Sequence, residues 1–449
     1  MTGIQKVTGG LPPAFLRLWA ASGVSGLGDG VYLAALPLLA SSLTHDPFTL
    51  SLVAATALVP WLLFGLIGGA LVDRWDRRRT MWTVDAGRAV LLAVPVVAAA
   101  FDVLSIPLLV GVAFLLGTGQ LLFDTAAQAY IPELLSREPA GLRVANSRLQ
   151  ATTSAGEGFV GPPTGSVLFT IGRAVPFALD ALSFALSAIL IRTLPAGPKR
   201  AEASDKAKGG ARGGIWAEAR AGASYVFHHR VLLGLALRPA IGNIAFMAGE
   251  GVLVLFAHER LHISSSGYGL LLACEAVGGL AGSTFAGRIG ERLGTGGALT
   301  ATAAVEGLAL LGFAVSPGAV PAGCCLAVLG AAMGATMVLG ATVRQSIVPA
   351  ELMGRVTAVT RLLAVSAAPL GALLGGFLAS SYGLRAPFLV GSALLMAMTF
   401  VTASLTTNHR VEEALAAARP RPTAPEVTED VEVTEAVEVT VAVTEAAAS

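Results

Sequence analysis

The sequence predicts an all-helical, polytopic membrane protein whose twelve transmembrane helices form two similar bundles of six. Hydrophobic residues make up 54% of the 449 residues and charged residues only 13%, whereas roughly a quarter of a soluble protein is charged. The apolar stretches reach about 20 residues, the length that a helix needs to cross a bilayer. They lack the alternating hydrophobicity of barrel strands, so helices are expected.

Charged residues and Pro or Gly turns divide the apolar sequence into twelve spans. The first six are expected near residues 14–42, 48–72, 80–101, 105–130, 144–171 and 174–194. The second six are expected near residues 231–257, 265–289, 297–316, 319–343, 356–381 and 385–406. We expect the first helix to be retained, because no short apolar region with a small-residue cleavage site precedes it.

Polar segments delimit the predicted domains. They are a cytoplasmic N-terminus at 1–13, an N-terminal bundle at 14–194, a cytoplasmic linker at 195–230, a C-terminal bundle at 231–406 and a disordered acidic tail at 407–449. The end of the tail repeats Val, Thr and Glu, a composition that buries too little apolar surface to fold. A strand paired with a partner is the alternative for this tail.

Lysine and arginine fall on alternate loops, and short basic loops stay in the cytoplasm. The basic loops lie at 74–79, 137–143, the linker, 288–292 and 355. The opposite loops carry little positive charge beyond Arg173, Arg260 and Arg385. Both termini are therefore expected in the cytoplasm. The abundance of Ala, Gly, Arg and Val suggests a GC-rich bacterium, and hence a bacterial plasma (inner) membrane.

The two bundles resemble each other in sequence. Residues 128–134 recur at 345–352, and residues 172–177 recur at 383–388. These matches keep one order and a nearly constant offset, which chance turn motifs rarely do. The repeat is therefore parallel, with six helices in each copy.

The turn after the second predicted helix is densely basic. Its distinctive residues are Gly69, Asp73, Arg74, Arg77 and Arg78. Arginine is costly in hydrocarbon, so this turn is expected at the cytoplasmic surface. A simple topology signal is one reading of the turn, and a specific structural role is the other.

Two six-helix halves with this turn resemble the major facilitator superfamily, over about residues 14–406. In that family the turn holds Gly, three residues, Asp, then a basic cluster, and only Asp76 departs from the pattern here. The resemblance implies that Asp73 accepts from a neighbouring helix N-terminus, where a carboxylate is favoured. It also implies that the arginines pair with acids across the cytoplasmic face and latch the outward-facing state. In the second half Gly287 replaces the acid, so a weaker latch is expected there.

The fifth predicted helix carries Gly156, Gly161, Pro162 and Gly165, which resemble the Gly-Pro motif of exporters in this superfamily. Glycine permits close helix approach and proline kinks a helix, so the motif is a candidate pivot, with ordinary packing as the alternative. Residues 26–38, 130–135 and 144–147 resemble the enterobactin-exporter and macrolide-efflux branch. That branch implies proton-driven export of bulky, amphipathic natural products such as antibiotics or siderophores.

Ionisable side chains inside spans are costly and are therefore candidates for function. Asp29 and Glu250 are the first candidates for proton coupling, because each interrupts a long apolar run in the first helix of its half. Glu157 and Glu275 come next. A structural role for Asp29, which lies between two glycines, is an equal alternative.

Other charged and aromatic residues are candidates for gating and for the substrate cavity. Asp85 and Arg88 are three residues apart on one helix face, where a structural pair is favoured over a proton relay. Arg148 and Arg361 occupy related positions in the two halves and are expected to pair with acids such as Asp124 or to anchor the interface. The cavity candidates, for which core packing is the alternative, are Tyr32, Trp61, Phe64, Phe123 and Phe246.

The sequence predicts neither an enzyme nor a metalloprotein. It has no metalloprotease motif and no Walker loop, and Cys274, Cys324 and Cys325 lie in apolar stretches. No cofactor and no nucleic-acid partner is expected. The expected partners are a small-molecule substrate, protons and the lipid bilayer, and the chain is expected to be a monomer. Export by proton antiport and alternating access is the leading hypothesis, and a flippase for lipid-like molecules or a facilitated importer is the alternative.

Overall fold

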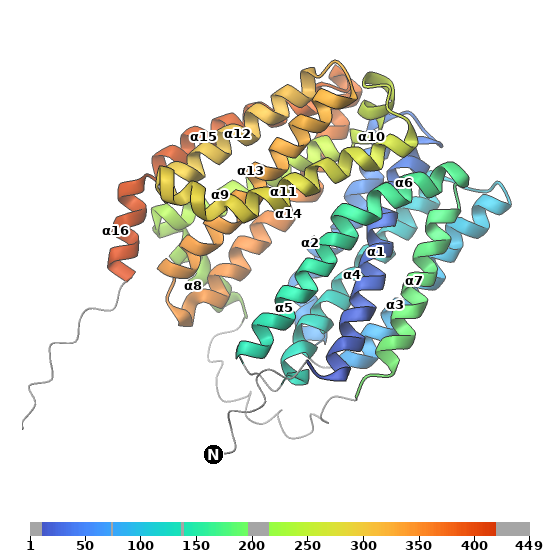
Figure 1. Ribbon diagram of the computed structural model, residues 1–449, viewed down its shortest axis with the longest axis horizontal. Coiled ribbons are helices and arrows are strands. Elements are labelled where there is room, and N and C mark those ends of the chain that lie inside the picture. The colour runs from blue at the N-terminus through green and yellow to red at the C-terminus, as the bar shows by residue number, and fades with distance from the viewer. Residues whose placement is uncertain (1–10, 73–74, 136–138, 196–214, 419–449) are drawn as a thin grey trace, which may run out of the picture.

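The computed structural model describes residues 11–72, 75–135, 139–195 and 215–418. Within these ranges the regular secondary structure is entirely helical, and the helices form two bundles (Figure 1). The N-terminal half contains α1 (Pro13–Ser41), α2 (Pro47–Val72), α3 (Arg77–Ala100), α4 (Ile106–Leu134), α5 (Pro139–Thr153), η1 (Ser154–Val160), α6 (Gly161–Ile171) and α7 (Val175–Arg192). The C-terminal half contains α9 (Arg230–Glu250), α10 (Leu253–Leu255), η4 (Phe256–Arg260), α11 (Ser265–Leu293), α12 (Thr295–Val315), α13 (Ala319–Ile347), α14 (Ala350–Tyr382) and α15 (Ala386–Leu405).

The twelve-span prediction is confirmed. Eleven of the described helices are individually long and apolar enough to cross a membrane. The remaining span runs through α5, η1 and α6, where a π-helical segment interrupts the α-helix. Neither Pro162 nor Pro163 has a backbone N–H, which explains why regular α-helical bonding fails just before them.

The halves touch along two seams. Helix α2 packs against α14, and α6 packs against α11, so each half offers one long helix and one glycine-rich helix to the other. Inside the N-terminal half, α1 packs against α5, η1, α6 and α7, while α3 lies against α4 and α7. This arrangement directs the polar residues of α1, α3, α4 and α5 toward one interior space.

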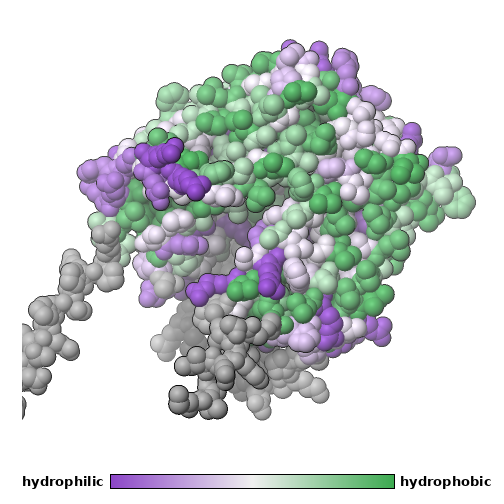
Figure 2. All heavy atoms as spheres, viewed as in Figure 1, coloured by the Kyte–Doolittle hydropathy of each residue, from purple (hydrophilic) through white to green (hydrophobic). Residues whose placement is uncertain are grey.

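The hydrophobic core shows at which end the halves meet. One apolar cluster joins both halves and includes Leu39, Leu50 and a ring group of Phe256, Phe313 and Phe388, whose centroids lie 4.7 to 5.2 Å apart. At the other end each half has its own cluster, around Phe15 and Val231 respectively. The protein is therefore closed at one end of the seam and separated at the other. Figure 2 shows a hollow between the halves with hydrophilic residues beside it.

Two helices lie outside the predicted spans. Helix α8 (Ile215–His228) falls in the predicted linker and packs against α14 and α9. Helix α16 (Asn408–Ala418) falls in the predicted disordered tail, so that prediction was wrong for residues 408–418. The reason is apolar burial: Val411 is 1% exposed, and Ala414 and Leu415 pack on the same cluster of the C-terminal half. The remainder of the predicted tail, 419–449, and residues 1–10 lie outside the described residues.

Candidate functional site

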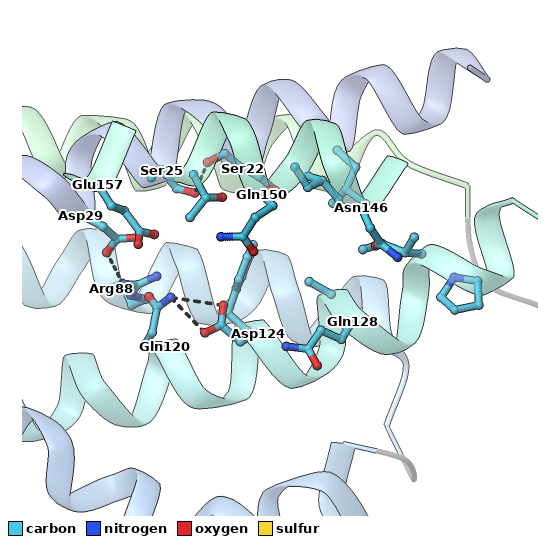
Figure 3. A pocket seen from close by; sticks show the side chains of 18 of the residues that line it. Ser22, Ser25, Asp29, Arg88, Gln120, Asp124, Gln128, Asn146, Gln150 and Glu157 are labelled. Atoms are coloured by element: carbon cyan, nitrogen blue, oxygen red, sulfur yellow. Dashed lines mark hydrogen bonds and ion pairs between the residues drawn. The ribbon is translucent and has the colours of Figure 1, made fainter. Parts of the chain in front are cut away.

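The N-terminal half encloses a cavity of about 610 Å³ (Figure 3). Helices α1, α3, α4 and α5 and the π-helical segment η1 form its walls. Its lining is unusually polar for the interior of a membrane bundle. The polar lining residues include Ser22, Ser25, Asp29, Arg88, Gln120, Asp124, Gln128, Asn146, Gln150 and Glu157.

An ion pair between α1 and α3 lies at one end of this cavity. The Arg88 guanidinium donates to Asp29 Oδ1 at 2.6 Å and lies 3.7 Å from Asp85 Oδ1. The Phe184 ring covers the guanidinium at 3.7 Å, and Ser187 donates to the other oxygen of Asp85 at 2.6 Å. The Asp85–Arg88 proximity agrees with the expected pair. The shorter bond to Asp29 joins two helices, so sequence spacing could not predict it.

Further carboxyl groups surround this single arginine. Asp124 accepts from the Gln120 amide at 3.2 Å, and Glu157 projects from η1 beside Asp29 in Figure 3. Behind α1, the buried Asp180 accepts from Ser183 at 3.1 Å. With Asp29 and Asp85, the described interior of this half holds five carboxyl groups around one guanidinium. Not all five can be ionised without a large excess of negative charge in a low-dielectric space.

The predicted helix-5 pivot residues hold η1 and α6 against α1. A Cβ at Gly156 would lie 2.9 Å from the Leu27 nitrogen, and one at Gly161 or Gly165 would overlap the α1 backbone. The carbonyl of Pro162 faces Gly269 of α11, so the same motif also touches the other half. Such contacts require glycine. They couple the position of Glu157 to that of Asp29.

The C-terminal half carries a different ion pair, which the sequence analysis did not select. Arg238 of α9 donates to Glu306 of α12 at 2.9 Å, and also to the Leu299 carbonyl, Thr302 and Thr336. The two charged residues are 4% and 6% exposed. The nearby pocket, lined by Glu306, has a volume of only about 30 Å³. Here the base is on the first helix of the half and the acid on the third, the reverse of the N-terminal half.

Glu250 and Glu275 lie apart from the N-terminal cavity. Glu250 ends α9 and Glu275 lies within α11, and the two carboxyl groups are in electrostatic range of each other and of the Tyr268 phenol. Neither forms an ion pair with a described cation. The structure thus separates the four predicted proton-coupling residues into two groups, Asp29 with Glu157 and Glu250 with Glu275.

The basic turn is only partly described. Gly69 ends the glycine-rich part of α2, and Asp73 and Arg74 lie outside the described residues. Arg77 bonds to Glu133 at 2.5 Å, and Arg78 donates to the Leu194 carbonyl at 2.8 Å. These partners belong to the same half as the turn, whereas the family resemblance implied partners across the cytoplasmic face.

In the second half the corresponding turn, between α11 and α12, is held by Asn408. The Asn408 side chain accepts from the Gly297 N–H at 2.8 Å and donates to the Leu293 carbonyl at 3.0 Å. It therefore bonds the last turn of α11 and the first turn of α12 at once. Gly294 makes the turn with a φ of 73°, a conformation that favours glycine. The second half has Gly287 where the first half has an acid. Its turn is instead bonded by the Asn408 side chain, which follows α15 in the sequence.

Arg148 and Arg361 both rest on tryptophan rings. Arg148 lies 5.9 Å from the Trp19 ring centroid, and Arg361 of α14 lies 5.3 Å from that of Trp61 on α2. Neither arginine forms an ion pair with an acid in the described part of the chain, although Arg361 lies within electrostatic range of Asp124, the expected partner. The Arg361 contact crosses from one half to the other.

A second cavity, of about 560 Å³, lies between the halves beside this contact. It is lined by α2 and α4 on one side and by α14 on the other. Of the predicted aromatic residues, Trp61 lines this cavity and Phe123 lines the first one. Phe246 lines the small pocket near Glu306. Tyr32 packs edge-on against Phe177, and Phe64 lines neither of the two larger cavities.

Comparisons with known proteins agree with this architecture. The chain is similar to the multidrug efflux pump Tap of Mycolicibacterium fortuitum, with 29% identity over 419 residues that cover 91% of this chain and 98% of Tap. It is also similar to the uncharacterized MFS-type transporter YfiS of Bacillus subtilis, with 26% identity over 86% of this chain and 92% of YfiS.

Solved structures share the fold. A bacterial homologue of the iron transporter ferroportin in an inward-facing state superposes with a TM-score of 0.69 at 15% identity, covering 88% of this chain and 98% of the homologue. A bacterial homologue of Spinster, inward-facing and unoccupied, gives 0.67 at 15% identity and covers 92% and 100%. Residues 12–445 match the family described as transmembrane secretion effectors. The chain therefore belongs to the transmembrane secretion effector family of the major facilitator superfamily.

Proposed function

We propose that the protein is a secondary active transporter that exports amphipathic, drug-like small molecules from the bacterial cytoplasm in exchange for protons. The observation that carries this proposal is the acid-rich cavity of the N-terminal half, which adjoins a second cavity between the halves. Charged groups inside a membrane bundle persist where they serve ions or substrates. The relatives named as multidrug efflux pumps support the substrate class and the direction.

Alternating access follows from the two seams. The halves are joined by apolar residues at one end and separated at the other end, where the first and last described helices begin and end, around Phe15 and Val411. We take that end as cytoplasmic, because the basic loops lie there. A substrate would enter from the cytoplasm, and rocking of the halves along α2–α14 and α6–α11 would expose it to the outside.

Exchange of substrate for protons needs a group that binds either the substrate or a proton, but not both at once. Asp29 is such a group, because it faces the cavity and its carboxylate is held by Arg88 at 2.6 Å. Protonation of Asp29 would remove its charge and weaken this bond. The net charge of the cavity would change by one unit, which at low dielectric is worth several kcal/mol to a charged ligand. Asp124 and Glu157 line the same space and would share the proton.

Dye transport in inverted membrane vesicles tests the proposal. Vesicles that contain the protein should accumulate an amphipathic fluorescent dye when an inward-acid pH gradient is imposed, and dissipation of the gradient should release the dye. Asp29→Asn should abolish accumulation. Glu291→Gln, at an exposed position near the end of α11, is the matched control and should transport normally.

One outcome would overturn the proposed function, and another would overturn the role of Asp29 alone. No gradient-dependent accumulation of any amphipathic dye would exclude export by proton antiport. Full transport by the Asp29→Asn variant would remove Asp29 from the coupling step.

A further inference from the structure

The two larger cavities lie on adjacent sides of one helix. Helix α4 presents Gln120 and Asp124 to the cavity inside the N-terminal half, and Leu121 and Thr125 to the cavity between the halves. Gln128 lines both. The two spaces therefore meet at Gln128, and a single elongated ligand that passes this side chain could occupy both.

The electrostatic character of the two spaces is opposite. Among the described residues, the first contains Asp29, Asp124 and Glu157, and its only arginine, Arg88, is already paired with Asp29. The described lining of the second contains one charged side chain, Arg361, among mainly apolar and small residues. A positive group is favoured in the first space and a negative group in the second.

Arg361 is free to bind a negatively charged group of a ligand. Its side chain is exposed to the cavity, and it forms no ion pair with any carboxylate that the structure describes. The planar guanidinium offers a fork of donors that matches a carboxylate. Trp61, whose ring lies against the guanidinium at 5.3 Å, also lines this cavity, so an aromatic frame bound beside Arg361 would meet an aromatic side chain.

We propose that the two cavities are subsites of one binding site, and that the preferred substrates are zwitterions carrying an amine and a carboxylate on a planar aromatic frame. The amine lies near Asp124, Glu157 and Asp29. The carboxylate lies at Arg361, and the neutral amide of Gln128 stands between them. This inference rests on the proposed function, because it names the substrate class of the same site.

The placement of the second subsite has a consequence for the transport cycle. Trp61 belongs to the N-terminal half and Arg361 to the C-terminal half. A group held in this cavity lies between α2 and α4 of one half and α14 of the other, whereas an amine in the first subsite contacts only the N-terminal half. A substrate without the carboxylate therefore loses the contact that connects its binding to the movement of the halves.

A rhodamine with a free carboxylate and its methyl ester form a matched pair of probes, because they share the cationic ring system and differ only in the acidic group. Equilibrium binding to the purified, full-length protein is measured by fluorescence polarisation. The wild type should bind the acid at least about tenfold more tightly than the ester, because a hydrogen bond to a charged group contributes at least the free energy that corresponds to a factor of about ten. Arg361→Gln should remove that preference and leave the affinity for the ester within about twofold.

Further variants make the result specific. Arg361→Lys keeps the charge but not the fork, so it should retain only part of the preference. Arg385→Gln, which removes an exposed arginine at the closed end, should leave both affinities unchanged. Asp124→Asn should weaken the binding of both dyes, because both carry the cationic group.

The inference is overturned if Arg361→Gln weakens both dyes equally, or if it weakens neither. Transport is measured separately in vesicles. If vesicles with the wild type accumulate no dye, but the purified wild type binds the acid more tightly than the ester, the proposed function is refuted and the subsites are not. Accumulation of both dyes with no binding preference for the acid would refute the subsites alone.

Discussion

Removal of Glu306 should destabilise the protein more than removal of any cavity acid. Glu306→Ala leaves the Arg238 guanidinium without its counter-ion in a site where the arginine is only 4% exposed. Breaking a buried ion pair in this way costs about 3–5 kcal/mol. Arg238 keeps its bonds to the Leu299 carbonyl, Thr302 and Thr336, so the lower limit of about 3 kcal/mol is expected.

The substitution Asp29→Asn, in the ion pair of the N-terminal half, should lower the free energy of unfolding by less. Asp29→Asn removes a carboxylate whose side chain is 20% exposed to the cavity, and Arg88 keeps Asp85 at 3.7 Å. The remaining charge partner and access to water limit the loss to about 1 kcal/mol. The Arg238–Glu306 pair is thus expected to stabilise the protein, and the Asp29–Arg88 pair is expected to act in transport.

Thermal unfolding in detergent, recorded at one scan rate, compares these variants. For a cooperative unit of the size of one half, 3 kcal/mol corresponds to a midpoint lower by about 6–12 °C. The double variant Arg238→Met with Glu306→Met should recover most of this loss, because no unpaired charge remains. Equal midpoints for Glu306→Ala and the wild type, or a larger decrease for Asp29→Asn, would show that the Arg238–Glu306 pair is not the main stabilising ion pair.

Substitutions at Asn408 and Gly30 test contacts elsewhere in the fold. Asn408→Ala should lower the unfolding midpoint by the equivalent of about 1 kcal/mol, as for loss of a helix cap, and Asn408→Asp, which keeps the acceptor, should lose less. Gly30→Ala places a Cβ 2.5 Å from a carbonyl oxygen of η1, so yield and dye export should fall, whereas Gly111→Ala meets open space and should behave as the wild type in both assays.

Hydropathy predicts the spans well because each helix must cover the same thickness of hydrocarbon. The span expected near 319–343 is α13, which extends a little further, to Ile347. The span expected at 144–171 is in the right place, but hydropathy cannot distinguish an α-helix from the π-helical turns of η1. Helix α16 was missed because one buried valine and a short apolar face barely alter the mean polarity of the tail.

The candidate site could be predicted only where one helix carries the whole interaction. Asp85 and Arg88 could be paired from their spacing, since three residues bring two side chains to one helix face. The Asp29–Arg88 and Arg238–Glu306 bonds depend on how separate helices are rotated against each other, which the single sequence does not record. For the same reason Asp29 and Glu157 could be proposed separately but not as neighbours.

Proton release on substrate binding shows whether substrate and protons compete for the N-terminal cavity. An amphipathic cationic dye is added to the purified protein in weakly buffered detergent solution, and a pH indicator reports the protons set free. If substrate and protons compete for the carboxylates of the N-terminal cavity, saturable dye binding should release protons, and the release should fall in Asp29→Asn and in Glu157→Gln. Saturable binding without proton release, or a release that neither variant reduces, would show that substrate and protons do not compete for these carboxylates.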